Sequence, residues 1–108
     1  MHLTAIGGAK VLLEPGEGLD PSDPDAYLEP LVAYLQERGA KVLLYDLTNV
    51  PVIDELYYHW LAAVNTICRI SGIRLVTVNM RPAAAYALAL TLDNPPVFEC
   101  ALDVNQVE

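Results

Sequence analysis

The chain has 108 residues, of which 54% are hydrophobic, and it carries a formal net charge of −8 at pH 7. Its length suits a single domain spanning residues 1–108. The acidic balance argues against nucleic acid and anionic membrane surfaces as partners, because both are bound through clustered Lys and Arg. No apolar run approaches the roughly 20 residues that span a bilayer, and the start of the chain lacks a signal-peptide pattern. We therefore expect a cytoplasmic protein whose two cysteines are free thiols.

The first residues predict a β-hairpin. Two short apolar pieces, residues 3–6 and 10–13, are separated by Gly7-Gly8, which is typical of two strands joined by a tight turn. These glycines lack the lysine and the spacing of a phosphate-binding loop. Residues 14–24 are rich in proline, glycine and acids and predict a loop.

The next segment predicts a helix. Asp23 is a candidate N-cap and Pro24 a candidate first helical residue. Apolar residues at helical spacing then continue to Arg38, and Gly39 ends the pattern. Pro30 removes a backbone donor, so it either kinks this helix or marks its true start.

The middle of the chain predicts a buried strand, a long helix and a second buried strand. Residues 41–47 and 73–78 are almost continuously apolar, as in strands covered on both faces. Asp54 opens the helix between them, which Ser71-Gly72 ends. The apolar residues that recur at helical spacing, and that we expect on its core face, are Leu56, Trp60, Ala63 or Val64, Ile67 and Ile70.

The last part predicts a third helix from Pro82 to Leu92 and a short strand within residues 97–102. The element order β-β-α-β-α-β-α-β implies an α/β fold with a mixed, mostly parallel sheet of about five strands and helices packed on it. The third helix is apolar on nearly all sides. It is either a buried crossover helix or an oligomer contact.

The start of the long helix is the most informative candidate site. Asp54 and Glu55 suit an N-cap and a first-turn acid, which accounts for both without any function. Tyr57 and Tyr58 come directly after Leu56. They cannot both lie on the core face, because Leu56 and Trp60 already occupy it. At least one tyrosine should then lie near the surface, where aromatic residues beside charge are typical of protein interfaces.

Other reactive residues favour structural roles. Asp46 ends a buried strand, where ligands collect in α/β sheets, but a carboxylate that caps the following turn, Thr48-Asn49, is the favoured explanation. His59 is expected to be partly buried, and Cys68 and Cys100 to be structural. A nucleophilic pair of Cys100 and His59 remains an alternative. No cluster predicts a metal site, and no cofactor is expected.

Four short motifs occur in order between Val42 and Leu92. They are a strand ending in Asp46, a hydrophobic run ahead of Asp54-Glu55, Arg69-Ile70-Ser71-Gly72, and Met80-Arg81-Pro82. Together they resemble the STAS domain of anti-sigma factor antagonists, and most closely its stressosome branch. The resemblance covers about half of the chain and implies a STAS-like fold and a non-enzymatic role in binding proteins.

The resemblance also implies where regulation would act. In the family a partner kinase phosphorylates the Ser or Thr after the Asp, a position that Glu55 occupies here. A second phosphorylated Thr of some scaffold members falls near Ala87. Neither residue accepts phosphate, so Glu55 either mimics the phosphorylated state or only stabilises the helix start.

The leading hypothesis is an interaction domain whose docking surface comprises Asp54, Glu55 and Tyr57 or Tyr58, with the Asn79-Met80-Arg81 loop beside them. Its partner would be an anti-sigma factor, a kinase-like protein or another STAS protein. The alternatives are a structural subunit of a homodimer or larger stressosome-like assembly, and a sensor of a small ligand or nucleotide. An enzyme that uses Cys100 or His59 comes last.

Overall fold

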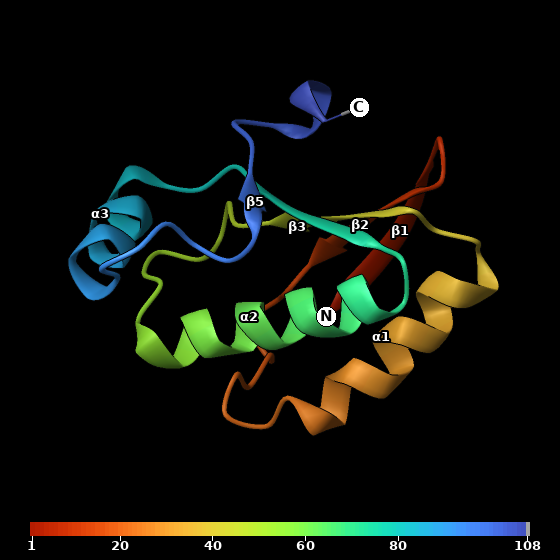
Figure 1. Cartoon of the computed structure of the whole chain (residues 1–108), viewed down its shortest axis with the longest axis horizontal. Coiled ribbons are helices and arrows are strands. Elements are labelled where there is room, and N and C mark those ends of the chain that lie inside the picture. The colour runs from red at the N-terminus through yellow and green to blue at the C-terminus, as the bar shows by residue number, and fades with distance from the viewer. Residues whose placement is uncertain (108) are drawn as a thin grey trace.

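A computed structural model describes residues 1–107. They form one five-stranded sheet, with the strands in the order β1-β2-β3-β4-β5, and three helices (Figure 1). The hairpin pair β1–β2 is antiparallel, and the other three pairs are parallel. The predicted α/β class and element order are therefore confirmed. The elements are β1 (His2–Gly7), β2 (Lys10–Glu14), α1 (Asp25–Glu37), β3 (Val42–Asp46), α2 (Glu55–Ile70), β4 (Arg74–Val78), α3 (Pro82–Thr91), β5 (Glu99–Cys100) and a 3-10 turn, η1 (Val104–Gln106).

The sheet is covered on both faces, which explains why its central strands are apolar throughout. Side chains alternate along a strand, so Leu43 and Tyr45 belong to the larger core cluster while Val42 and Leu44 belong to a smaller one. Helices α1 and α2 cover the first face, and the C-terminal segment lies on the opposite face (Figure 1). Helix α3 stands at the end of the sheet where β3 and β4 finish.

The hairpin turn is tight, as the sequence predicts. Gly8 and Ala9 adopt φ angles of 61° and 60°, a left-handed conformation that glycine tolerates and alanine rarely adopts. A register shift between Ala5 and Gly7 accompanies this turn. The two predicted strands are confirmed on either side of it.

Helix α2 has the predicted bounds, and Trp60 and Val64 are buried as predicted. The predicted core face is wrong at its two ends, because Leu56 and Ile70 are exposed, at 47% and 77%. The helix is rotated so that Tyr57, not Leu56, packs against the larger core cluster. The buried residues of the helix are Trp60, Leu61, Val64, Asn65 and Cys68.

Two element boundaries also differ from the prediction. Helix α1 begins at Asp25 with Pro24 as its N-cap, and it continues through Pro30, which is therefore not the helix start. The main chain of Asp23 still accepts a hydrogen bond from the Ala26 N–H, at 3.3 Å, but its side chain does not cap the helix. Strand β5 contains only Glu99–Cys100, so the other residues predicted for it, Val97, Phe98, Ala101 and Leu102, lie outside the strand.

Candidate functional site

The edge of the sheet where β3 and β4 end is held together by Asp46. Its Oδ1 accepts hydrogen bonds from the Thr48 N–H at 2.9 Å, the Thr48 hydroxyl at 2.6 Å and the Asn79 amide at 3.2 Å. Partial burial raises the pKa of Asp46, but the hydrogen bonds from Thr48 and Asn79 outweigh it and hold that pKa below its usual value. The interpretation of Asp46 as a turn cap is thus confirmed, and it also fixes the β3–α2 loop to the β4–α3 loop.

The start of α2 lies in the first of these loops. Asp54 is the N-cap, and its Oδ1 accepts a hydrogen bond from the Tyr57 N–H at 2.8 Å. Glu55 is exposed in the first turn. Within residues 1–107 its side chain makes no hydrogen bond and no ion pair. Asp54 alone therefore performs the capping, and the Glu55 carboxylate faces solvent.

Tyr57 is anchored inward by a chain of hydrogen bonds. Its hydroxyl meets that of Tyr45 at 2.6 Å, and Trp60 Nε1 donates to the Tyr45 hydroxyl at 2.8 Å. Burial raises the pKa of both tyrosines, so both stay neutral. Tyr57 is half-buried and joins β3 to α2 as well as reaching the surface.

Tyr58 points to a different part of the molecule. Its hydroxyl accepts a hydrogen bond from the Val97 N–H at 3.3 Å, and its ring lies 5.7 Å from that of Phe98. It is half-buried beneath the segment leading to β5. The expected surface tyrosine is therefore not a freely exposed side chain, because both candidates are partly enclosed.

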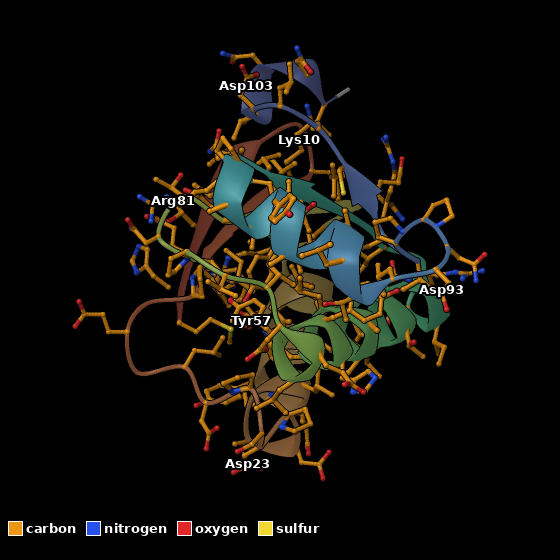
Figure 2. All side chains as sticks on the ribbon, turned by 90° about the vertical axis from the view of Figure 1, so that its left-hand side faces the viewer. Lys10, Asp23, Tyr57, Arg81, Asp93 and Asp103 are labelled. Atoms are coloured by element: carbon orange, nitrogen blue, oxygen red, sulfur yellow. The ribbon has the colours of Figure 1, made fainter. Side chains whose placement is uncertain are left out.

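A groove of about 630 Å³ brings Tyr57 and Arg81 together. Arg81 is exposed at the N-cap position of α3, and within the described chain its guanidinium has no hydrogen bond or ion pair. Figure 2 looks on to this end of the molecule, with Arg81 on one side and Tyr57 near the centre. We call this the Arg81 groove; its lining residues are Pro15, Gly16, Glu17, Leu19, Asn49, Val50, Pro51, Val52, Tyr57 and Arg81.

The remaining predicted residues do not line that groove. Asn79 adopts a left-handed φ of 59°, and its N–H donates to the Leu102 carbonyl at 3.1 Å. Met80 lines a second cavity, beside α3. Ala87 is half-buried in α3 and lines neither space. The three side chains of residues 79–81 therefore lie in three different places: Asn79 bonds to Asp46, Met80 lines the second cavity, and Arg81 lines the Arg81 groove. The sequence predicted the loop that contains Pro15 to Leu19 but not its position in the wall of the Arg81 groove, because acids and glycines in a loop indicate only a turn.

The reactive side chains are placed partly as predicted. Cys68 is buried, and burial raises the pKa of its thiol to about 12, as expected for a packing residue. Cys100 and His59 are both exposed, which corrects the expectation that one is structural and the other partly buried. In the described part of the chain no hydrogen bond joins them, and no three metal-binding side chains gather at one place. No helix formed by residues 1–107 has the length and hydropathy of a membrane span.

Comparison with solved structures identifies proteins of the same fold. RsbS of Moorella thermoacetica, in a form with a serine-to-glutamate substitution, matches with a TM-score of 0.80 at 18% identity, over 96% of this chain and 90% of that one. A chain of the stressosome, described as a signal integration and transduction hub, gives 0.80 at 17% identity, over 97% and 90%. The NMR structure of the protein TM1081 gives 0.76 at 17% identity, over 94% and 81%. No family model and no curated protein matches the sequence. The STAS-like fold implied by the sequence motifs is confirmed.

Proposed function

We propose that the chain is a non-enzymatic regulator of the anti-sigma factor antagonist type, which acts in the cytoplasm by binding a protein partner. The fold that it shares with RsbS and a stressosome chain supports this assignment. The proposed docking site rests on the arrangement of side chains at the start of α2. There the exposed carboxylate of Glu55 has no partner within residues 1–107, and the same helical turn contributes Tyr57 to the Arg81 groove.

The charges at this site suit an interface with a polar rim. Glu55 presents a negative charge and Arg81 a positive one, both exposed, while Tyr57 and Val52 supply apolar surface between the loops. Arg and Tyr are among the residues enriched where protein partners bind most strongly. We infer a partner of the anti-sigma factor or kinase-like class, or another STAS protein, with charges complementary to both groups.

Glu55 is proposed to hold this surface in one binding mode. Because Asp54 already caps the helix, the only local role left for Glu55 is its favourable interaction with the helix dipole, worth about 0.3–1 kcal/mol. A glutamate brings one negative charge, whereas a phosphoserine brings about −1.5 to −2. The proposed interface would therefore be permanently charged and would not be switched by phosphorylation at this residue.

A charge reversal tests the docking site. Glu55→Lys should reduce retention of the partner from a native-cell extract by at least about tenfold, since it places a like charge opposite the partner's complementary group. Glu37→Lys, at an exposed acid at the far end of α1, is the matched control. A partner retained equally by both variants and by the unaltered chain would show that the start of α2 is not the docking site.

A second substitution tests the origin of the site. Glu55→Ser restores a hydroxyl at the position after Asp54, so a cognate kinase with ATP should phosphorylate it, and partner retention should then depend on phosphate. The readouts are intact mass and quantitative capture. If the variant gains no phosphate and binds each partner unchanged, the surface is not an inherited phosphorylation switch.

The exposed side of α3 favours a second candidate function, that of a scaffold subunit. Tyr86 and Leu90 are 68% and 72% exposed on this helix, and apolar side chains of this size are commonly covered in assemblies. Size-exclusion chromatography with light scattering should then detect a stable oligomer, which Leu90→Glu should dissociate. A monomer at all concentrations tested would eliminate this candidate.

A further inference from the structure

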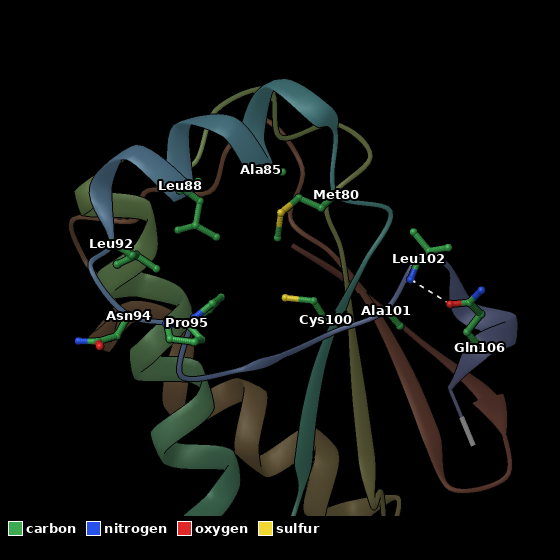
Figure 3. Close-up of a pocket in the computed structure, with 12 residues that line it drawn as sticks. Met80, Ala85, Leu88, Leu92, Asn94, Pro95, Cys100, Ala101, Leu102 and Gln106 are labelled. Atoms are coloured by element: carbon green, nitrogen blue, oxygen red, sulfur yellow. Dashed lines mark hydrogen bonds between the residues drawn. The ribbon is translucent and has the colours of Figure 1, made fainter.

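A second cavity, of about 680 Å³, lies between α3 and β5. We call it the α3–β5 cavity. Met80 and Leu88 form part of its apolar wall, and the Cys100 thiol points into it from the sheet (Figure 3). It does not share a lining residue with the Arg81 groove. Its volume lies within the roughly 300–1,000 Å³ typical of small-molecule sites.

The cavity arises where small side chains of α3 face a distant segment of the chain. Helix α3 contacts the core through only two buried side chains, Ala84 and Leu88. The small side chains of Ala85 and Ala89 face the opening, so this side of the helix cannot fill the space beside the sheet. Pro95 and Pro96 form part of the opposite wall, and proline restricts the backbone there. The walls therefore come from separate segments of the chain.

The lining restricts the chemistry of a ligand. Within the described chain no Asp, Glu, Lys, Arg or His side chain lines the cavity. Nucleotides and other phosphate-bearing molecules are poor candidates for this site, because phosphates are normally met by cationic side chains or clustered N–H donors. A charged ligand of either sign would also be desolvated without a partner, which is costly.

The polar groups that are present are two amides and one thiol. Gln106 Oε1 accepts a hydrogen bond from the Leu102 N–H at 3.4 Å (Figure 3), which leaves its NH₂ group to donate. The amide of Asn94 makes no hydrogen bond within residues 1–107. Figure 3 shows the two amides at opposite ends of the cavity, so a carbonyl or ether oxygen on a ligand would accept a hydrogen bond from one of them.

We propose that the α3–β5 cavity binds a neutral, largely apolar small molecule that carries a hydrogen-bond acceptor. This site does not depend on the docking surface at Glu55. It would make the chain responsive to a small organic compound of a class that excludes nucleotides. The occupant is a small molecule, because the volume of the cavity and its largely apolar lining match those of small-molecule sites.

The cysteines allow this proposal to be tested on the unaltered chain. Of the two cysteines, Cys68 is fully buried, so iodoacetamide should label only Cys100 in the folded protein. Nile red, a neutral apolar dye with a carbonyl acceptor, serves as the probe. We expect its emission to shift to the blue on binding, and saturating dye to slow the labelling of Cys100 by at least about tenfold. Dye binding that leaves the labelling rate unchanged overturns the proposal, as does no binding.

Matched substitutions on α3 locate the bound dye. Ala89→Trp fills the cavity and should weaken dye binding by at least about tenfold, whereas Ala83→Trp, at an exposed alanine outside it, should change binding by less than about twofold. Ala85→Phe is a second filling variant, and circular dichroism together with protection of Cys68 reports that each variant is folded. Equal binding by the filling and control variants would show that the dye binds elsewhere and would overturn the proposal.

Discussion

The hydroxyl of Tyr45 joins a buried strand to a helix, and its loss should be costly. It accepts the buried Trp60 N–H and meets the Tyr57 hydroxyl, while the Tyr45 side chain is fully buried. Tyr45→Phe leaves the Trp60 N–H without an acceptor. It should therefore lower the free energy of unfolding by about 1–3 kcal/mol, measured by urea denaturation.

Tyr57→Phe is the internal control for that prediction. It removes one hydroxyl but leaves the bond from Trp60 to Tyr45 in place, and Tyr57 is only half-buried. Its cost should be smaller than that of Tyr45→Phe. Equal losses, or a larger loss for Tyr57→Phe, would mean that the bond between the tyrosines, and not the one to Trp60, stabilises this junction.

Asp54 can be tested separately as a cap and as a charge. Asp54→Ala removes the acceptor for the Tyr57 N–H and should lower the free energy of unfolding by about 1 kcal/mol. Asp54→Asn keeps an acceptor and should cost much less. If Asp54→Asn retains stability but loses the partner, the carboxylate charge itself belongs to the docking surface. If both properties survive in Asp54→Asn, its role is confined to capping.

These single-residue roles differ in how far the sequence reveals them. The caps at Asp46 and Asp54 act on residues two and three positions away, so local patterns predict them. The hydroxyl of Tyr57 meets a residue on another element, Tyr45. Local sequence patterns do not reveal that contact. From the sequence alone, Leu56 is therefore a better candidate for the core than Tyr57, and only the position of β3 shows otherwise.

The junction between β3 and the β4–α3 loop should depend on pH. Hydrogen bonds hold the pKa of Asp46 below its usual value, so its carboxylate stabilises the folded chain above the unfolded pKa of about 3.9. That contribution is lost as the pH falls through the lower, folded pKa. Because water screens this half-exposed group, Asp46→Asn should cost no more than about 1 kcal/mol at pH 7.

The pH dependence separates this effect from a steric one. The difference in unfolding free energy between the unaltered chain and Asp46→Asn should shrink towards zero as the pH falls below the lowered pKa of folded Asp46, where both side chains are neutral. Glu99, whose pKa is lowered by its hydrogen bonds to Arg74, titrates in both proteins, so its contribution cancels in the difference. A difference that stays constant from pH 7 to acid would assign the cost to shape and not to charge.

At the level of elements, long buried segments were predictable and the bounds of the short last strand were not. Strands β3 and β4 and helix α2 lie within about one residue of their predicted bounds, because their apolar runs reflect burial between layers. Strand β5 is held by two residue pairs with β4, so its extent depends on a neighbour and not on its own propensity. The face that α2 turns inward also depended on a neighbour, through Tyr45.

At the scale of the whole molecule, the sequence located the docking candidates but not the spaces around them. Arg81 and Tyr57 line one groove because the Asp46–Asn79 hydrogen bond joins two loops. The α3–β5 cavity arises where alanines of α3 face the C-terminal segment. Such spaces depend on the packing of segments that lie far apart in the chain, and residue spacing carries no information about them.

The second face of the sheet provides a test of how the molecule closes. Val107 is 5% exposed and packs with Val42, Leu44, Val76 and Val78, and the Lys10 ammonium donates to the Val107 carbonyl at 2.6 Å. Val107→Ala removes two buried methyl groups and should lower the free energy of unfolding by about 1–2 kcal/mol in urea. Val97→Ala, at a side chain that is 57% exposed, should change it by less than about 0.5 kcal/mol. Equal effects of the two substitutions would mean that the C-terminal segment does not contribute to the stability of the sheet. A larger loss for Val107→Ala would establish that this segment is part of the second core.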